Sequence, residues 1–148
     1  MIPSGIEETT PLYTLKMASI LSGVPAHSIR QYVDRDLVLP YTTESQRHLF
    51  SQEDILRLKC ITYFLREQKL NIAGIKAIYS LIPCWYVKNC PEDERVNCPA
   101  YKSSWIPCWQ ASNKDASCRN LDCRSCEVYR LSADQVSVKE YICGNHIC

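Results

Sequence analysis

Short apolar stretches alternate with polar turns through the first half of the chain, in an order that predicts two short helices followed by a hairpin. Residues 12–15 read as an extended segment, and residues 17–21 as a helix that ends at Gly23, because glycine tolerates the positive φ that ends many helices. A second helix starts at Pro25, where a proline is tolerated, and runs to about Asp34. Its inner face is expected to carry Ile29, Tyr32 and Val33.

A polar loop with β-prone ends, residues 41–50, follows and suits a two-stranded wing. Ser51-Gln-Glu-Asp54 resembles a capping box and predicts the start of a long helix, and Asn71 opens another. Helical spacing relates Ile55, Leu58, Ile61 and Leu65 in the first of these helices, and Ile72, Ile75, Ile78 and Ile82 in the second. Two helices packed around a glycine also occur in proteins that never touch DNA. The wing and the later helices favour a winged helix-turn-helix.

The second half of the chain has a different composition. Of the ten cysteines, only Cys60 precedes residue 84, and this half contains no Phe and few Leu or Ile. Such a segment buries little apolar surface and needs disulfides or metal to hold it together. The expected fold is therefore mainly α with a small β wing: a winged helix-turn-helix followed by a small, cysteine-rich, metal-braced domain. The expected boundaries are a tail over 1–11, the winged head over 12–82, the cysteine module over 83–130 and a terminal segment over 131–148.

Formal net charge is only +1, so any attraction to nucleic acid must come from local placement of basic side chains. The N-terminus has no signal-peptide pattern, and no apolar run is long enough to span a bilayer. We therefore expect a cytoplasmic protein without a membrane partner. In a reducing compartment, clustered thiols favour metal ligation or redox sensing over a disulfide framework.

Over about residues 12–82, the sequence resembles the MerR family of regulators. The resemblance is carried by Tyr13-Thr-Leu, Ser22-Gly-Val24, Ile29-Arg-Gln-Tyr32, Leu39-Pro40, His48-Leu-Phe-Ser51, Glu53-Asp-Ile and Asn71-Ile-Ala-Gly-Ile-Lys76. The last string is most similar to the heat-shock-repressor branch. What the resemblance implies is a DNA-reading head, with double-stranded DNA as the main partner and RNA polymerase and a second copy of the chain as further candidates.

The same resemblance implies which residues meet DNA. His27, Ser28 and Arg30 are expected to face bases or phosphate from the recognition helix, and Tyr32 to donate its hydroxyl to a phosphate. General chemistry agrees, because Arg and Tyr bind phosphates well and Arg or His reaches base edges. An ion pair of Arg30 with Asp34 is the alternative.

The sequence departs from the family pattern at two positions. His48 stands in the wing where the family usually has Arg, and we expect the neighbouring Arg47 to take over the phosphate contact. Asp36 replaces a glycine after the recognition helix, and the turn should survive because Asp tolerates left-handed backbone better than most residues.

The cysteine-rich half repeats the tripeptide Pro-Cys-Trp at 83–85 and 107–109. Its arrangement is similar to the two-CW cysteine module, a small module of uncertain activity. The matching cysteines, all candidate metal ligands, are Cys84, Cys90, Cys98, Cys108, Cys118, Cys123 and Cys126. A two-residue gap lets Cys123 and Cys126 bind one ion. Seven thiolates exceed the four of one tetrahedral site, which leaves open a zinc site with spare redox-active thiols or an iron–sulfur cluster.

Three further features leave alternatives open. Trp85 and Trp109 are expected to cover the site and exclude water, or to bind an aromatic ligand. The terminal segment Cys143-Gly-Asn-His146-Ile-Cys148 has three possible roles: it adds metal ligands, it forms a disulfide, or it is a frayed tail. Cys60 is expected to be a buried small hydrophobe rather than a ligand.

Three functions compete. The leading hypothesis is a sequence-specific DNA-binding transcriptional regulator whose cysteine module senses metal or redox state or is structurally metal-bound. The alternative is an architectural, excisionase-like DNA-binding accessory protein with an inert zinc-braced interaction module. An enzyme or electron carrier is disfavoured because a nucleophilic cysteine needs a nearby base, and His146 alone is near in sequence. No long dimerisation helix follows residue 82, so a dimer must use the module or residues 131–142. A monomer that binds cooperatively on DNA is the other option.

Overall fold

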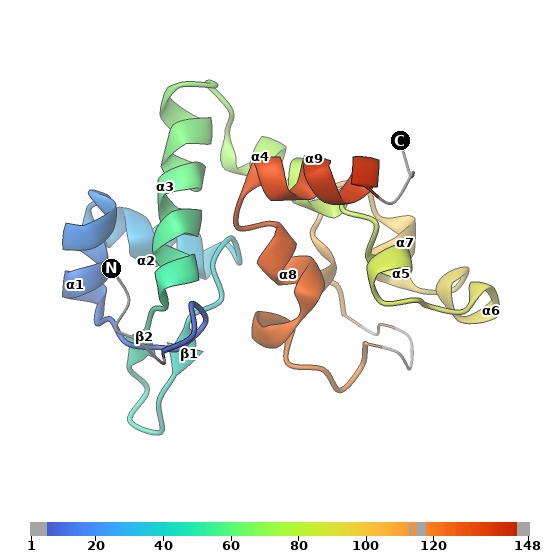
Figure 1. The fold of residues 1–148 in the computed structure, drawn as a ribbon, viewed down its shortest axis with the longest axis horizontal. Helices are drawn as coiled ribbons and strands as arrows, with labels where there is room; N and C mark the ends of the chain where they lie inside the picture. Colours follow the sequence, from blue (N-terminus) through green and yellow to red (C-terminus); the bar gives the residue numbers. More distant parts are fainter. Residues whose placement is uncertain (1–5, 113, 115–117, 145–148) are drawn as a thin grey trace. The chain divides into compact units, whose positions relative to one another are not determined.

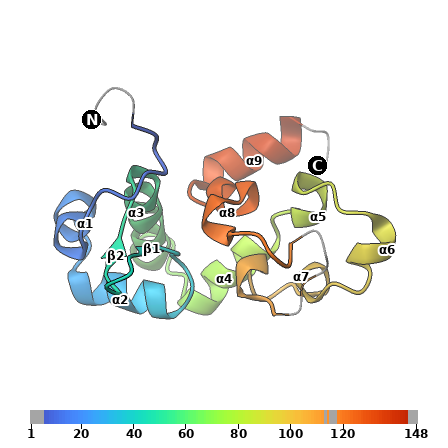
Figure 2. The same cartoon turned by 90° about the horizontal axis from the view of Figure 1, so that it is seen from below.

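The structure, a computed structural model, describes residues 6–112, 114 and 118–144 (Figures 1 and 2). Its backbone divides into two units, Met1–Gln68 and Lys69–Cys148. The elements of the first unit are α1 (Leu15–Ser22), α2 (Ala26–Asp34), β1 (Tyr41–Thr42), β2 (His48–Leu49) and α3 (Gln52–Arg66).

The helix-turn-helix begins one residue after Thr14, whose hydroxyl accepts a hydrogen bond from the backbone N–H of Met17 at 3.3 Å. This cap makes Leu15 helical, so the expected extended segment over 12–15 is wrong at its end. Only Tyr13 pairs in extended form, with Phe50. The glycine turn is confirmed, because Gly23 ends α1 at φ 72° and its N–H bonds the carbonyl of Ser19.

The predicted wing is present as an antiparallel two-stranded sheet that pairs Tyr41 with Leu49 and Thr42 with His48. Upstream of it, Asp36 adopts φ 59°, the left-handed conformation predicted for this position. The capping box of α3 is also confirmed. The Ser51 hydroxyl accepts from the Asp54 N–H at 3.1 Å, and the Asp54 carboxylate accepts from the Ser51 N–H at 2.8 Å.

The core of the first unit forms where α1 packs on both α2 and α3 (Figure 1). On α3, Phe64 is buried while Leu65 is half-buried, so Phe64 completes the apolar face predicted for Leu65. Side chains buried in this unit are Ala18, Val24, Ile29, Tyr32, Leu37, Val38, Phe50, Ile55, Leu58, Ile61 and Phe64. Aliphatic and aromatic carbon therefore holds the head together.

Short helices linked by turns make up the second unit (Figure 2). Its elements are α4 (Ile72–Ser80), α5 (Cys84–Val87), α6 (Glu92–Arg95), α7 (Pro99–Lys102), the 3₁₀ turns η1 (Cys108–Gln110) and η2 (Cys123–Ser125), α8 (Glu127–Leu131) and α9 (Gln135–Gly144). Asn71 caps α4 as predicted, its side chain accepting from the Gly74 N–H at 2.8 Å. Along α4, Ile75 and Tyr79 are buried whereas Ile78 is exposed, so Ile78 does not share the inner face suggested by its spacing.

Aromatic rings take much of the place of an aliphatic core in the second unit. Trp109 lies between Tyr79 and Tyr129, with ring centroids 5.5 and 5.1 Å away. Helix α8 contacts α5, η2 and α9, and α7 contacts η1. Across the described residues, no helix is long and apolar enough to cross a membrane.

Candidate nucleic-acid interface and thiol-lined cavity

A groove on the first unit runs between the start of α1, helix α2 and the wing, with a volume of about 680 Å³. Three of the predicted DNA-binding residues, Arg30, Arg47 and His48, line it together. The structure therefore brings the recognition helix and the wing to one concave surface, although Arg30 and Arg47 are seventeen positions apart in the sequence.

The wing side of this groove is held by short hydrogen bonds. Thr42 Oγ1 and His48 Nδ1 lie 3.2 Å apart across the two strands. At the tip, Thr43 Oγ1 accepts from the Arg47 N–H at 3.1 Å, and the Thr43 N–H donates to the Arg47 carbonyl at 2.9 Å. These bonds fix the backbone that carries Arg47 and His48 while both side chains stay exposed.

The other predicted DNA-binding residues are placed differently. His27 is exposed and Ser28 half-buried on α2, and neither lines the groove. The Tyr32 side chain is only 5% exposed and belongs to the core. Its phosphate contact stays a prediction, as do the individual roles of the others.

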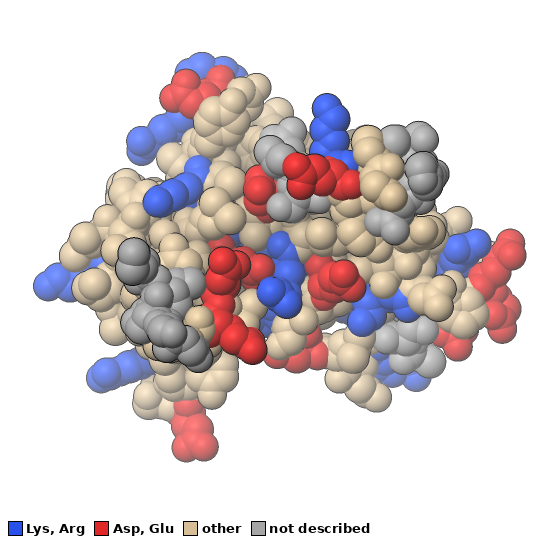
Figure 3. Space-filling model, viewed as in Figure 1, with Lys and Arg blue, Asp and Glu red and all other residues tan. Residues whose placement is uncertain are grey.

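Lys16 also lines the groove, and sequence reasoning missed it. The available signal was a lysine in the first turn of the helix that opens the helix-turn-helix. Basic side chains here matter because the surface as a whole is not basic: on the face in Figure 3, Lys and Arg are interspersed with Asp and Glu. Positive charge at the groove comes from three local side chains, Lys16, Arg30 and Arg47.

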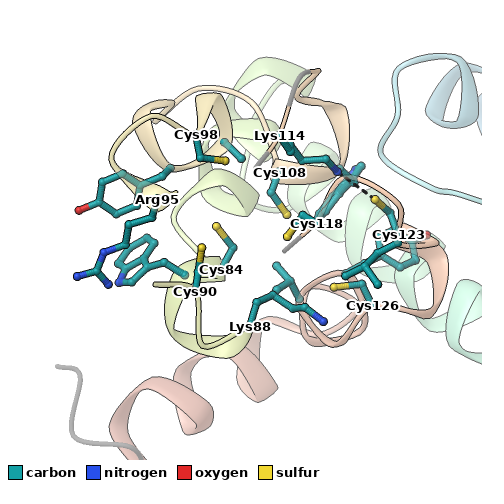
Figure 4. A pocket seen from close by; sticks show the side chains of 17 residues that line it. Cys84, Lys88, Cys90, Arg95, Cys98, Cys108, Lys114, Cys118, Cys123 and Cys126 are labelled. Atoms are coloured by element: carbon teal, nitrogen blue, oxygen red, sulfur yellow. Dashed lines mark hydrogen bonds between the residues drawn. The ribbon is translucent and has the colours of Figure 1, made fainter. Parts of the chain in front are cut away.

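In the second unit, all seven predicted ligand cysteines line a single cavity of about 30 Å³. In Figure 4 the labelled thiols come from opposite sides of this space and converge on it. Such a volume holds about two water molecules. Trp85 and Trp109 line the same cavity, as both alternatives require, a cover that excludes water or a platform for an aromatic ligand.

Two interactions stand out among the cavity side chains. Side-chain hydrogen bonding with Cys84, followed by burial, holds the pKa of Cys108 well above its usual range. Lys114 Nζ donates to Cys123 Sγ at 3.3 Å (Figure 4). Burial lowers the pKa of Lys114, but this hydrogen bond and the charges of Cys123, Cys108 and Cys118 raise it by more. The cavity wall therefore carries an ammonium group at neutral pH.

The cavity suits a soft metal by its chemistry, since thiolates are the preferred ligands of zinc and of iron–sulfur clusters. Among the described residues, no three Cys, His, Asp or Glu side chains stand ready as a metal-ligand set. Metal binding would therefore have to displace thiol protons and draw the sulfurs inward. The donor types and their shared cavity fit a thiolate-bound metal.

The remaining cysteines lie elsewhere. Cys60 on α3, predicted to be a buried small hydrophobe, is half-buried and does not line the cavity, and Cys143 on α9 is exposed. His146 and Cys148 lie outside the described residues, so the alternatives for the terminal segment stay open. None of the nine cysteines in the described ranges is in a disulfide.

Residues 13–81 match the family described as MerR HTH family regulatory protein. This stretch contains the helix-turn-helix, the wing, α3 and α4 described above. Residues 13–81 are a MerR-family helix-turn-helix domain. The MerR match ends before the cysteines of the cavity, so it accounts for the groove and leaves the thiols unexplained.

Named relatives agree with the MerR match. A heat shock protein named HspR from Streptomyces coelicolor is 34% identical over 79 residues, which cover 53% of this chain and 52% of that protein. The HTH-type transcriptional regulators GlnR of Bacillus anthracis and Bacillus cereus are 37% identical over 70 residues, 47% of this chain and 54% of theirs. The chain spans about half the length of these curated relatives.

Proposed function

We propose that this protein is a sequence-specific DNA-binding transcriptional regulator whose cysteine-rich unit binds metal through thiolates and reports metal or redox state to the head. The observation that carries the DNA-binding part is the groove shared by Arg30, Arg47 and His48 in a MerR-type head. The GlnR relatives are named transcriptional regulators, which supports regulation rather than catalysis. A cytoplasmic location belongs to the same proposal.

Within the groove the side chains divide by chemistry. Arg30 projects from α2, the helix that corresponds to the recognition helix, and its guanidinium can pair with a base edge in the major groove. Arg47 and Lys16 suit phosphate oxygens, which position a protein on DNA without reading sequence. His48 joins them from the wing.

The sensing part rests on the cavity in the second unit. Seven thiols, two tryptophans and Lys114 line one small space, and thiolates both bind metal and react with oxidants, so either event can alter the fold of this unit. Zinc and an iron–sulfur cluster are the two cofactors that this donor set supports.

The DNA-binding proposal is tested by footprinting purified protein on DNA from the region upstream of its own gene. Arg30→Ala should weaken specific binding by about 1–3 kcal/mol, roughly fivefold to 140-fold. Arg66→Ala, at the exposed end of α3 and away from the groove, is the charge-matched control and should leave affinity unchanged. Purely non-specific binding, equal on all sequences and steeply dependent on salt, would contradict the proposal.

The sensing proposal is tested by repeating the footprint with metal-loaded, chelator-treated and oxidised protein. Sensing predicts that affinity or footprint pattern changes between these states. If affinity stays constant while the protein bends its DNA in every state, the architectural alternative replaces the regulatory one.

Partners other than DNA belong to the same proposal. MerR-family regulators commonly act as dimers, and RNA polymerase is the other candidate partner. Among the described residues after α3, the longest helix is α9, Gln135–Gly144, with ten residues. A dimer would therefore form through the second unit. Sedimentation equilibrium with and without DNA separates a stable dimer from a monomer that pairs only on its operator.

A further inference from the structure

The cysteine-rich unit contains an internal repeat that is longer than its shared Pro-Cys-Trp tripeptide. Cys90 precedes Cys98 by eight positions and Tyr101 by eleven, and Cys118 precedes Cys126 and Tyr129 by the same intervals. The first repeat covers residues 83–101 and the second residues 107–129. They differ by a four-residue insertion between the tripeptide and the second cysteine.

The two repeats have similar local structures. Trp85 packs edge-on against Tyr101, with centroids 5.2 Å apart at 90°, and Trp109 packs edge-on against Tyr129, 5.1 Å apart at 88°. Cys98 and Cys126 each stand at the residue before a short helix, α7 and α8, in the same extended backbone conformation. The sequence repeat is therefore also a structural one.

Elements of the two repeats contact each other, so the repeats do not form two separate subdomains. Helix α5, from the first repeat, contacts α8 of the second, and η1 of the second repeat contacts α7 of the first. Each tripeptide segment thus contacts the Cys-x-x-Tyr helix of the other repeat, while its tryptophan packs on the tyrosine of its own repeat. This reciprocal exchange is the relation expected of two halves around an approximate twofold axis, with the cavity between them.

Six of the seven cavity thiols form matched pairs across the repeats. The pairs are Cys84 with Cys108, Cys90 with Cys118, and Cys98 with Cys126.

Cys123 stands apart from these pairs. It follows Cys118 by five positions, and the equivalent position in the first repeat is Arg95, whose guanidinium lies over the Tyr101 ring at 5.8 Å. The Cys123 sulfur accepts from Lys114 instead (Figure 4). The odd thiol therefore has its own cationic partner.

Among the three matched pairs, Cys84 and Cys108 interact across the repeats, since the Cys84 side chain is the first cause of the raised pKa of Cys108. Two tetrahedral ions need eight metal–sulfur bonds, and six thiolates supply eight only if two of them bind both ions. A shared ligand must lie near both ions, hence near the axis that relates them. Cys84 and Cys108, the matched pair that interacts directly, suit these shared positions.

We propose that the six paired cysteines bind two zinc-like divalent ions in one centre, with Cys84 and Cys108 shared between the ions and Cys123 outside it. This inference rests on the proposed metal binding and specifies its stoichiometry and ligands. Two divalent ions and six thiolates carry two net negative charges. Lys88, Arg95 and Lys114 line the same cavity and offset this charge.

An iron–sulfur cluster agrees less well than two zinc-like ions with six cysteines in matched pairs. Such clusters take four cysteine ligands and bring their own sulfide, which leaves two of the six paired thiols unused and needs more room. A cavity of about 30 Å³ suits small ions held by protein sulfur better.

The test uses the full chain, reconstituted anaerobically with zinc and, separately, with a spin-active cadmium isotope. Elemental analysis should give two ions per chain. Cadmium NMR should give two resonances in the range of all-sulfur sites, split by metal–metal scalar coupling, which is transmitted only through a shared ligand. This experiment needs no variant and so does not depend on a mutant folding.

Two substitutions sharpen the assignment. Cys84→Ser should abolish the scalar coupling and lose at least one of the two ions, because it removes a shared thiolate. Cys123→Ser should keep both ions and the coupling. If Cys84→Ser does not fold, the coupling in the unmodified protein still decides between shared and separate sites.

The outcomes separate the two proposals. One ion per chain, two uncoupled ions, or an iron–sulfur cluster formed with acid-labile sulfide would overturn the two-ion centre while leaving thiolate metal binding in place. Loss of the coupling in Cys123→Ser would overturn the ligand assignment. A chain that binds no zinc, cadmium or cluster would overturn both this inference and the metal part of the proposed function, and would leave the DNA-binding part untouched.

Discussion

The interiors of the head and of the cysteine-rich unit are made of different chemical groups. Buried carbon fills the interior of the head, from Ile29 on α2 to Leu58 and Ile61 on α3, all fully buried. In the second unit, thiols and aromatic rings surround a cavity. The first kind of interior is stable by itself, whereas the second gains stability when something binds the thiols. The comparison suggests that only the second unit is built to change state.

Metal removal should separate the two units most clearly. Chelation of the metal-loaded protein should remove folding free energy on the order of 10 kcal/mol from the second unit and none from the first. Hydrogen exchange followed by mass spectrometry should show lost protection in α5 to α8 and retained protection in α1 to α3. Equal loss of protection in both units, or no loss in either, would show that the two units do not differ in their dependence on metal.

The aromatic packing of the second unit is the next largest effect. Trp109→Ala should cost this unit about 3–5 kcal/mol, because the ring is 9% exposed and lies between Tyr79 and Tyr129. Trp105→Ala is the matched control, since that ring is 77% exposed. Urea titration of metal-loaded protein, with hydrogen exchange assigning the loss to a unit, measures both. Similar losses for the two variants would show that the aromatic cluster is not the core.

The stability cost of a cavity made in the head by mutation should not depend on metal. Leu58→Ala should destabilise the head by about 2–5 kcal/mol, because Leu58 is fully buried. Leu56→Ala, on the same helix but 43% exposed, should cost far less. The same urea titration, run with and without chelator, checks this. A chelator-dependent cost for Leu58→Ala would mean that the head draws stability from the metal unit.

The smallest effect concerns the cap of α3. Ser51→Ala should cost the head about 1 kcal/mol, since it removes the hydroxyl that accepts from the Asp54 N–H. Ser51→Thr keeps the hydroxyl and should recover most of the loss. Thermal unfolding followed by circular dichroism measures the difference. A Thr variant as unstable as the Ala variant would point to packing around Ser51 rather than to capping.

Most of the head was predictable from sequence because its signals are local. Gly23 and the Ser51–Asp54 box each act within a few residues and were found where predicted, and so was the Asn71 cap at the start of the second unit. Fine detail was less predictable. Thr14 starts α1 earlier than expected, and Arg57 is fully buried although long cationic side chains usually face water. The Thr14 cap acts over three residues and was open to prediction, whereas the burial of Arg57 depends on neighbours that spacing does not reveal.

For the cysteine-rich unit, the sequence predicted which residues line the site but not how they are arranged. Its seven cysteines and two tryptophans could be named from the sequence, and all line one cavity. Their pairing could not be deduced, because a four-residue insertion disguises the repeat and the contacts exchange between the two halves.

The sequence by itself determined the helices, the wing and the set of thiols, because caps, glycine turns and hydrophobic periodicity act over one or two turns of chain. Only the tertiary structure decided which groups meet: Lys16 with Arg30 and Arg47 at the groove, Cys84 with Cys108 across the repeats, and Lys114 with Cys123. These meetings depend on long-range packing, which joins residues that local chemistry leaves independent.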